Sequence, residues 1–164
     1  MTRFWLDASF FIHASRNLYA FDINESFWAW LDDRILEGVV VSPKRVYEEV
    51  TANLRHQDAL ARWVKSRKRN GLCIPPDAAV QRVAKDVSDY IFSGRYPIEE
   101  AWDFSRGADA WVISHAKADG GHVITCESQR HPEANKVRIP DVCHNFKVEC
   151  YDIIGAMRVM KAKI

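Results

Sequence analysis

The sequence has almost no net charge and no long apolar run, and each absence excludes a class of protein. Across 164 residues, 23 Lys and Arg nearly balance 22 Asp and Glu, which gives a formal net charge of +1 at pH 7. A global attraction to nucleic acid is therefore excluded, and any such contact must come from a local patch. No apolar stretch reaches the roughly 20 residues of a membrane-spanning helix, so we expect no membrane contact.

The N-terminus and the cysteines predict a cytoplasmic protein. Arg3 and Asp7 interrupt the first apolar stretch, where a signal peptide would need an unbroken one. The four cysteines form no Cys-x-x-Cys pair, and a domain of this length folds without disulfides, so reduced thiols are expected. A zinc site is disfavoured because its candidate ligands match no common zinc spacing. They are Cys126, His131, Cys143, His144 and Cys150.

Length and patterning predict one α/β domain over residues 1–164, with no linker or repeat. Short apolar runs alternate with segments of helical period. Strands are predicted from Phe4 and over 39–42, 122–126 and 147–150, and residues 72–74 form a further short apolar stretch. Helices are predicted from Phe10, over 27–36, from Pro43 to Leu54, over 56–69 and 78–92, from Asp109 to Gly120, and over 151–161. This alternation predicts a mostly parallel sheet of about five strands, covered by helices on both faces.

A single acid, Asp7, interrupts the first apolar run, which extends from Phe4 to Ile12. It stands where the strand pattern changes to helical spacing. Ligands of open parallel sheets bind at this edge, beyond the carboxyl ends of the strands. An acid in such apolar surroundings is costly to bury unless it has a purpose. Asp7 is therefore the first candidate for a functional residue.

Three further acids occupy equivalent places along the chain. Glu49 lies in the helix after the second strand, Asp109 at a helix start, and Glu127 directly after the 122–126 strand. Clustered carboxylates repel one another, and bound cations relieve that repulsion. Oxygen ligands select hard ions such as Mg²⁺ or Mn²⁺. Since such ions promote phosphodiester hydrolysis, all four acids are candidate catalytic and metal-binding residues.

Structural explanations compete for some of these acids. Asp109 could be only a helix N-cap or a first-turn acid that suits the helix dipole. Asp141 fits helix capping better than a peripheral role at a metal. Of the adjacent pair Glu48 and Glu49, the second precedes an apolar residue and is the better candidate to face inward.

Several segments together resemble a known family. The segments FWLDAS (4–9), VYEEV (46–50), ADAWVISHA (108–116) and VITCE (123–127) are similar to a PIN domain. The segment KVRIPDVC (136–143) resembles the PIN-like subfamily DUF4411. The resemblance covers nearly the whole chain. It implies a three-layer α/β/α sandwich and an Mg²⁺- or Mn²⁺-dependent ribonuclease, often the toxin of a bacterial toxin–antitoxin pair, as in VapC-like toxins.

The resemblance also implies roles for individual residues. Carried over by position, it makes Asp7, Glu49 and Asp109 metal ligands, with Ser9 and Thr125 as supporting hydroxyls. The sequence departs from the PIN pattern where an aspartate is usual and Glu127 stands instead. Its longer side chain can reach a metal directly or through water, which leaves the number of bound ions open.

Basic residues provide candidate RNA contacts. Arg130 follows the fourth acid closely enough to reach a scissile phosphate. The densest cationic run contributes Lys65, Arg67, Lys68 and Arg69, although cations also suit the carboxyl end of a helix.

We therefore expect a metal-dependent endoribonuclease that cleaves RNA and is held in check by a protein antitoxin. A catalytically inactive PIN-like module that binds RNA or a protein stays open as the alternative. A homodimer also stays open, because Trp28 and Trp30 cannot both face one core and one of them could mark a partner surface. Phosphatase chemistry is disfavoured, since the segment after Asp7 lacks the second acid of a D-x-D motif.

Overall fold

Five parallel strands form the centre of the computed structural model, which describes residues 2–53, 58–128 and 133–164. The strands are β1 (Phe4–Leu6), β2 (Val40–Pro43), β3 (Cys73–Ile74), β4 (His122–Ile124) and β5 (Cys150–Tyr151), in the spatial order β3-β2-β1-β4-β5. In register, Trp5 of β1 lies opposite Val41 on one side and Val123 on the other. The predicted α/β fold with a parallel sheet is confirmed.

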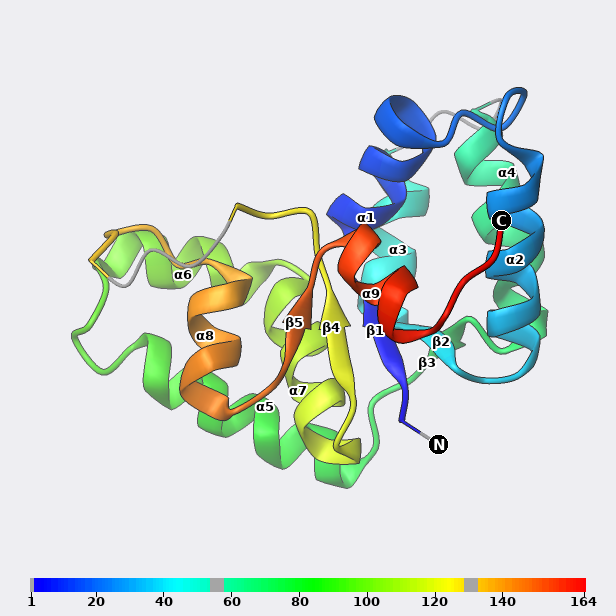
Figure 1. Ribbon diagram of the computed structural model, residues 1–164. Coiled ribbons are helices and arrows are strands. Elements are labelled where there is room, and N and C mark those ends of the chain that lie inside the picture. Colours follow the sequence, from blue (N-terminus) through cyan, green and yellow to red (C-terminus); the bar gives the residue numbers. More distant parts are fainter. Residues whose placement is uncertain (1, 54–57, 129–132) are drawn as a thin grey trace.

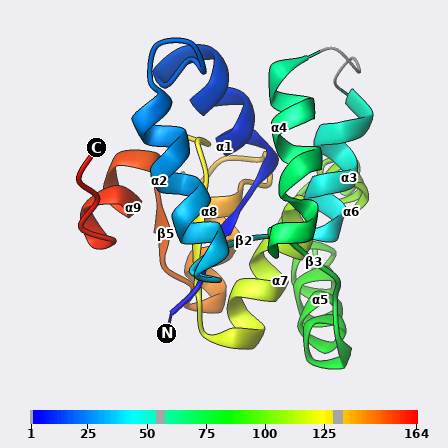
Figure 2. The ribbon, with the colours of Figure 1, turned by 90° about the vertical axis from the view of Figure 1, so that its right-hand side faces the viewer.

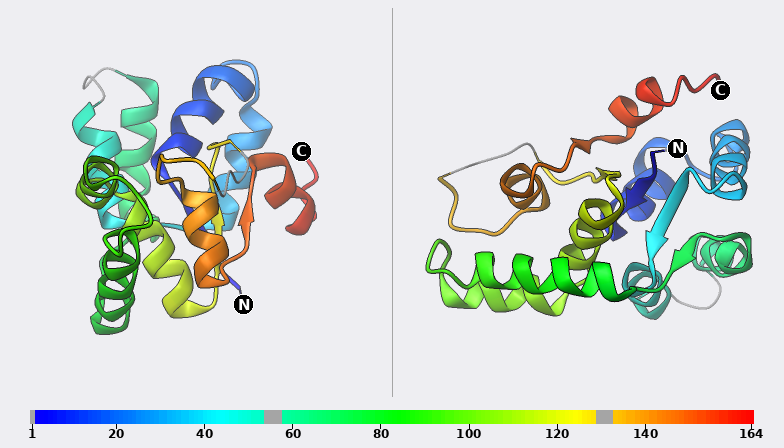
Figure 3. Two further views of the ribbon diagram at one scale, coloured as in Figure 1. Left: turned by 90° about the vertical axis from the view of Figure 1, so that its left-hand side faces the viewer. Right: turned by 90° about the horizontal axis from the view of Figure 1, so that it is seen from below.

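Helices cover both faces of this sheet and give three layers (Figures 1 and 3). One face carries α5 (Ala78–Ile91), α7 (Asp109–Asp119) and α8 (Ile139–Phe146). The other carries α1 (Ala8–His13), α2 (Glu25–Leu36) and α9 (Ile153–Val159). In the described ranges, no helix is long and apolar enough to cross a membrane.

The helix α3 (Lys44–Asn53) lies beside β2 and β3, near one edge of the sheet, and contacts both helical layers (Figure 2). It packs against α1, against α7 and against α4 (Ala59–Arg67). The last of these is fixed to α2 by Arg67, whose Nε donates to Asp32 Oδ1 at 2.8 Å. Because α3 follows β2 and touches α7, it brings its own acids near the start of α7.

The core surrounds the central strand β1. Both faces of β1 are covered, and Phe4, Trp5 and Leu6 are only 4%, 1% and 0% exposed. Burying apolar surface of this kind is the main favourable term in folding. Trp28 of α2 is also buried, and Trp30 is half-buried against the same core, so the prediction that the two cannot both face one core is wrong.

Some boundaries differ from the sequence predictions. The helix α6 (Ile98–Arg106) was not predicted, although Glu99 and Glu100 favour its first turn and Ala101 and Phe104 supply a buried face. The first helix begins at Ala8 instead of Phe10. It does so because a side chain just before it caps the helix, as described below.

The C-terminal elements also shift relative to the prediction. Strand β5 begins at Cys150 instead of 147, because α8 extends to Phe146 and Lys147 ends it in a left-handed conformation (φ 56°). The last helix begins at Ile153 behind the N-cap Asp152. The predicted end of α3 at Leu54 and the predicted start of α4 at His56 both lie outside the described residues.

Gly121 lies directly before β4, where the chain packs too closely against the start of β1 to leave room for a side chain. A Cβ at this position would lie 2.7 Å from the carbonyl oxygen of Arg3 and 2.7 Å from Asp119 Oδ1. We therefore expect Gly121→Ala to lower the free energy of unfolding by about 1–3 kcal/mol, the usual cost of overpacking. Urea denaturation of the purified chain measures this change.

Gly107→Ala is the matched control for this prediction. The nearest atom to its added Cβ would be the Phe104 carbonyl oxygen at 3.8 Å, an ordinary contact. We expect no loss of stability there, and an equal loss at both glycines would contradict the packing argument.

Candidate active site

Asp7 lies at the carboxyl end of the central strand and also begins the first helix. Its Oδ1 accepts a hydrogen bond from the Phe10 backbone N–H at 2.8 Å, which makes it the N-cap of α1. The side chain is only 2% exposed. A carboxylate therefore sits at the edge of the sheet, held there by the strand before it and the helix after it.

Two hydroxyls fix the second oxygen of Asp7. Ser9 Oγ donates to Asp7 Oδ2 at 2.7 Å, and Thr125 Oγ1 donates to the same oxygen at 2.6 Å. Each hydroxyl also accepts a backbone N–H from the segment after β4: Ser9 from Cys126 at 3.0 Å and Thr125 from Glu127 at 3.1 Å. Ser9 and Thr125 therefore connect Asp7 to the start of the segment that carries the fourth acid.

The other three acids come from separate elements. Glu49 belongs to α3, and its Oε2 accepts from the Ala108 N–H at 3.2 Å, directly before α7. Asp109 is the first residue of α7, at which no side-chain N-cap bond forms. Glu127 follows β4, and its Oε2 accepts from the Ile139 N–H at 2.7 Å, at the start of α8. The fold thus gathers four acids that lie far apart in sequence.

Their charges act on one another. The pKa of Asp109 is raised from 3.8 to about 7, first by burial and then by the negative charges of Glu127, Asp7 and Glu49, against a lowering by Lys136. The pKa of Asp7 is raised to about 6, mainly by burial, although the hydrogen bonds from Thr125 and Ser9 oppose the shift. Strongly shifted acids that also repel one another are typical of functional sites.

The donor set suits a hard cation, but the side chains are engaged with the protein. Carboxylate oxygens are the ligands that Mg²⁺ and Mn²⁺ prefer. Asp7, Glu49 and Glu127 each accept a backbone or hydroxyl hydrogen bond instead. Among the described residues, no three Asp, Glu, His or Cys side chains form a group that could hold an ion as they stand. Metal binding would therefore need side-chain rotation or bridging water.

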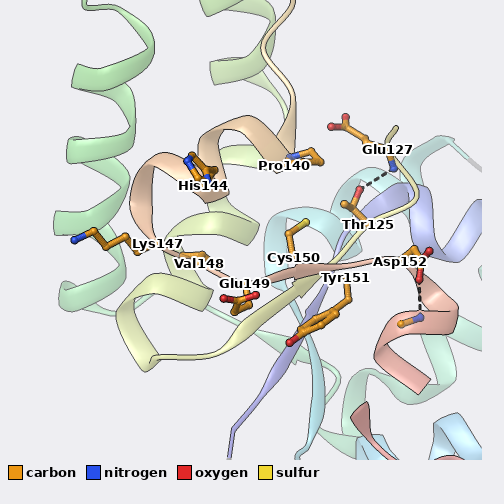
Figure 4. A pocket seen from close by; sticks show the side chains of 11 residues that line it. Thr125, Glu127, Pro140, His144, Lys147, Val148, Glu149, Cys150, Tyr151 and Asp152 are labelled. Carbon is orange, nitrogen blue, oxygen red and sulfur yellow. Dashed lines mark hydrogen bonds between the residues drawn. The ribbon is translucent and has the colours of Figure 1, made fainter. Parts of the chain in front are cut away.

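A large hollow lies beside Glu127 and Thr125 (Figure 4). Its volume is about 710 Å³, and it extends between α8, β5 and the start of α9. His144 and Lys147 stand on the α8 side, whereas Tyr151 and Asp152 line the side of β5 and α9. A cavity of this size next to the acids gives space for a substrate.

The matching family is described as Domain of unknown function (DUF4411), and the match covers residues 4–164. The chain belongs to the DUF4411 family. No curated protein matches it. The part of the sequence resemblance that concerns DUF4411 is therefore confirmed. The resemblance to PIN domains stays a prediction.

Two of the predicted RNA contacts of this DUF4411 chain are engaged with other side chains, and one lies outside the described residues. Arg67 forms an ion pair with Asp32 and stacks on Trp63, with its Cζ 4.8 Å from the ring centroid. Lys68 lies over the ring of Tyr47 at 5.1 Å. Lys65 and Arg69 belong to the same segment, at the end of α4 and in the turn that follows. Arg130 lies outside the described residues.

Asp141 does not cap a helix. The N-cap position of α8 is Arg138, and Asp141 lies in the first turn, so the capping interpretation is wrong. The side chain is 8% exposed. Its charge contributes to the raised pKa of Tyr96, which burial raises first. The first backbone N–H of α8, that of Ile139, donates its hydrogen bond to Glu127.

Two features of the site had no signal in the sequence. Lys136 lowers the pKa of Asp109, yet in the sequence it is only the first residue of the KVRIPDVC segment. Ile139 and Ala108 contribute backbone N–H groups, for which side-chain identity carries no information. Only the folded chain reveals these partners.

The acids predict an unusual pH dependence of stability. In the folded chain, Asp7 and Asp109 hold their protons more tightly than in the unfolded chain, where the pKa of an aspartate has its ordinary value of 3.8. The unfolding free energy of the metal-free protein should therefore fall as pH rises from about 4 through about 7. Asp109→Asn should flatten this fall and raise the melting temperature at pH 8, measured by thermal denaturation in EDTA.

Asp89→Asn serves as the control for this pH series. Asp89 lies on α5, with an exposed side chain that pairs with Lys85 at 2.6 Å. Its variant should keep the pH dependence of the unchanged chain. If Asp109→Asn keeps the same dependence as well, the electrostatic account of the acids is wrong.

Proposed function

We propose that this chain is an Mg²⁺- or Mn²⁺-dependent endoribonuclease of the PIN-like type. One observation carries the proposal: Glu127, Asp7 and Glu49 all add their negative charge to the site of Asp109, at the carboxyl end of the central strands. Ligand sites of open parallel sheets lie at this edge. A fold gains nothing from concentrating four repelling acids there, whereas a divalent cation would relieve the repulsion.

The side chains of such a site would have two roles, which are to bind the ion and to position its ligands. Asp7, Glu49, Asp109 and Glu127 would hold the ion, directly or through water. When bound, the ion supplies an activated water and a positive charge for the leaving oxygen. Ser9 and Thr125 keep Asp7 in one orientation, because both donate to its Oδ2. Asp109 must lose its proton to bind a cation, so metal binding should strengthen as pH rises through about 7.

The hollow of about 710 Å³ supports a polymeric substrate. Thr125 and Glu127 line it together with residues of β5 (Figure 4). His144 and Lys147 are among the residues that line the hollow, and both side chains carry nitrogen atoms that can donate to phosphate. The PIN-like resemblance supports RNA as the substrate, and it supports a role in the cytoplasm as a toxin restrained by a protein antitoxin.

Asp7→Asn tests the proposed activity. Asparagine serves as an N-cap about as well as aspartate, so α1 should persist while the negative charge is lost. We expect the purified chain to cleave single-stranded RNA with Mn²⁺ or Mg²⁺, and we expect Asp7→Asn to reduce the rate by about 100-fold or more. Gel analysis of a labelled RNA and circular dichroism of both proteins measure activity and folding together.

Asp58→Asn is the matched control for Asp7→Asn. Asp58 is the N-cap of α4 and accepts from the Leu60 N–H at 2.8 Å, so the change removes a charge from another capping residue. Its cleavage rate should match that of the unchanged chain. RNA cleavage that persists in Asp7→Asn would overturn the proposed function.

One observation favours a catalytically inactive PIN-like module instead. In the described part of the chain, the acids do not form a ready ion site, and Glu127 already bonds to the Ile139 N–H. Calorimetry with Mn²⁺ separates the two functions. Binding that is lost in Asp109→Asn supports the enzyme, whereas RNA or protein binding without any Mn²⁺ uptake supports the module.

A further inference from the structure

A second hollow lies between α3 and α7, where the start of α5 meets them. Its volume is about 320 Å³, near the lower end of the range of about 300–1,000 Å³ for small-ligand sites. Lys44, Arg45 and Glu48 of α3 line one side, and Trp111 and His115 of α7 line another. Two prolines complete the lining, Pro43 and Pro76. We call it the α3–α7 hollow.

The α3–α7 hollow adjoins the acids. Arg45 and Glu49 are one turn apart on α3, which places them on the same side of the helix. Both reach the segment before α7: Arg45 Nη2 donates to the Arg106 carbonyl at 3.5 Å, and Glu49 Oε2 accepts from the Ala108 N–H at 3.2 Å. The hollow and Glu49 therefore contact the same short segment before α7.

The two cations of the hollow are weakly held. Lys44 Nζ lies 3.6 Å from Glu48 Oε1, and Arg45 Nη1 lies 3.8 Å from Glu48 Oε2. Their side chains are 55% and 56% exposed. Exposed ion pairs of this length contribute little to stability, so a phosphate can replace Glu48 as the partner of both cations at little cost. The hollow thus offers two cations to one anion.

The opposite wall is aromatic and uncharged. Trp111 is half-buried, which leaves part of its indole open to a ligand. His115 is 2% exposed, and burial lowers its pKa to about 4, so the ring is neutral. Its ring packs against Trp5 at a centroid distance of 4.4 Å. An aromatic surface opposite two cations is the combination that single-stranded nucleic acids require.

We propose that the α3–α7 hollow binds one nucleotide of a single-stranded RNA, beside the bond to be cleaved. The base lies on Trp111, and the phosphate lies between Lys44 and Arg45. This inference rests on the proposed function, since it supplies the position of the substrate strand on the side of the acids opposite β5. Stacking accepts any base, so the hollow adds affinity without sequence preference.

RNA binding in an Asp7→Asn background tests this inference. Fluorescence anisotropy of a labelled single-stranded oligoribonucleotide with Mn²⁺ gives the dissociation constant without cleavage. Lys44→Ala with Arg45→Ala, and separately Trp111→Ala, should each weaken binding about tenfold. The double variant should also reduce the slope of log K against log salt by about 0.7, the value for one phosphate contact on a single strand. Trp111→Phe should keep most of the affinity.

Lys85→Ala is the control, because Lys85 is an exposed cation on α5 that pairs with Asp89. Its affinity for RNA should stay unchanged, and thermal denaturation should show that all variants fold. Unchanged RNA affinity in both hollow variants, or no RNA binding by the parent protein, overturns the inference.

Cleavage kinetics separate this inference from the proposed function. In the otherwise unchanged chain, the hollow variants should raise KM about tenfold and leave kcat within about twofold, because the hollow positions the strand. If Asp7→Asn cleaves normally while the hollow variants still lose RNA affinity, the proposed function fails and the nucleotide site stands. If cleavage depends on Asp7 but the hollow variants keep the RNA affinity of the unchanged chain, the nucleotide site fails and the proposed function stands.

Discussion

Repulsion between carboxylates at one edge of the sheet is the constraint on which the rest of the structure depends. A parallel sheet directs the carboxyl ends of its strands to one side, so acids that follow β1 and β4 must come together there. The connection through α3 and the start of α7 adds Glu49 and Asp109. Burial raises the pKa of Asp109 to about 7, and the negative charges of the neighbouring acids add to this shift.

The protein holds these acids with groups that are already part of its secondary structure. The Asp7 carboxylate caps α1, Glu49 accepts an N–H at the start of α7, and Glu127 accepts the first N–H of α8. Helix starts expose unpaired N–H groups and the positive end of the helix dipole, so each acid gains a favourable partner. This explains how an acidic cluster and a stable fold can coexist in a chain of nearly zero net charge.

The sequence was sufficient to predict the fold, but it predicted only part of the site. Alternating strand and helix patterns were sufficient for the parallel sheet, because β-branched runs such as 39–42 are distinctive. The acids could be nominated, since Asp7 interrupts an apolar run. Helix α6 was not predicted, although Pro97 occupies its N-cap position. The partners of Glu49 and Glu127 could not be predicted, because backbone amides carry no side-chain signature.

The bond between Glu127 and the first amide of α8 has a consequence for the larger hollow. α8 forms a wall of that hollow, and Glu127 stands at its mouth (Figure 4). A ligand that draws Glu127 away releases the amino end of α8, and a ligand that shifts α8 changes what holds Glu127. Thermodynamic linkage requires the two effects to be equal in free energy. Binding at the acidic edge and binding in the larger hollow are therefore coupled through the bond between Glu127 and α8.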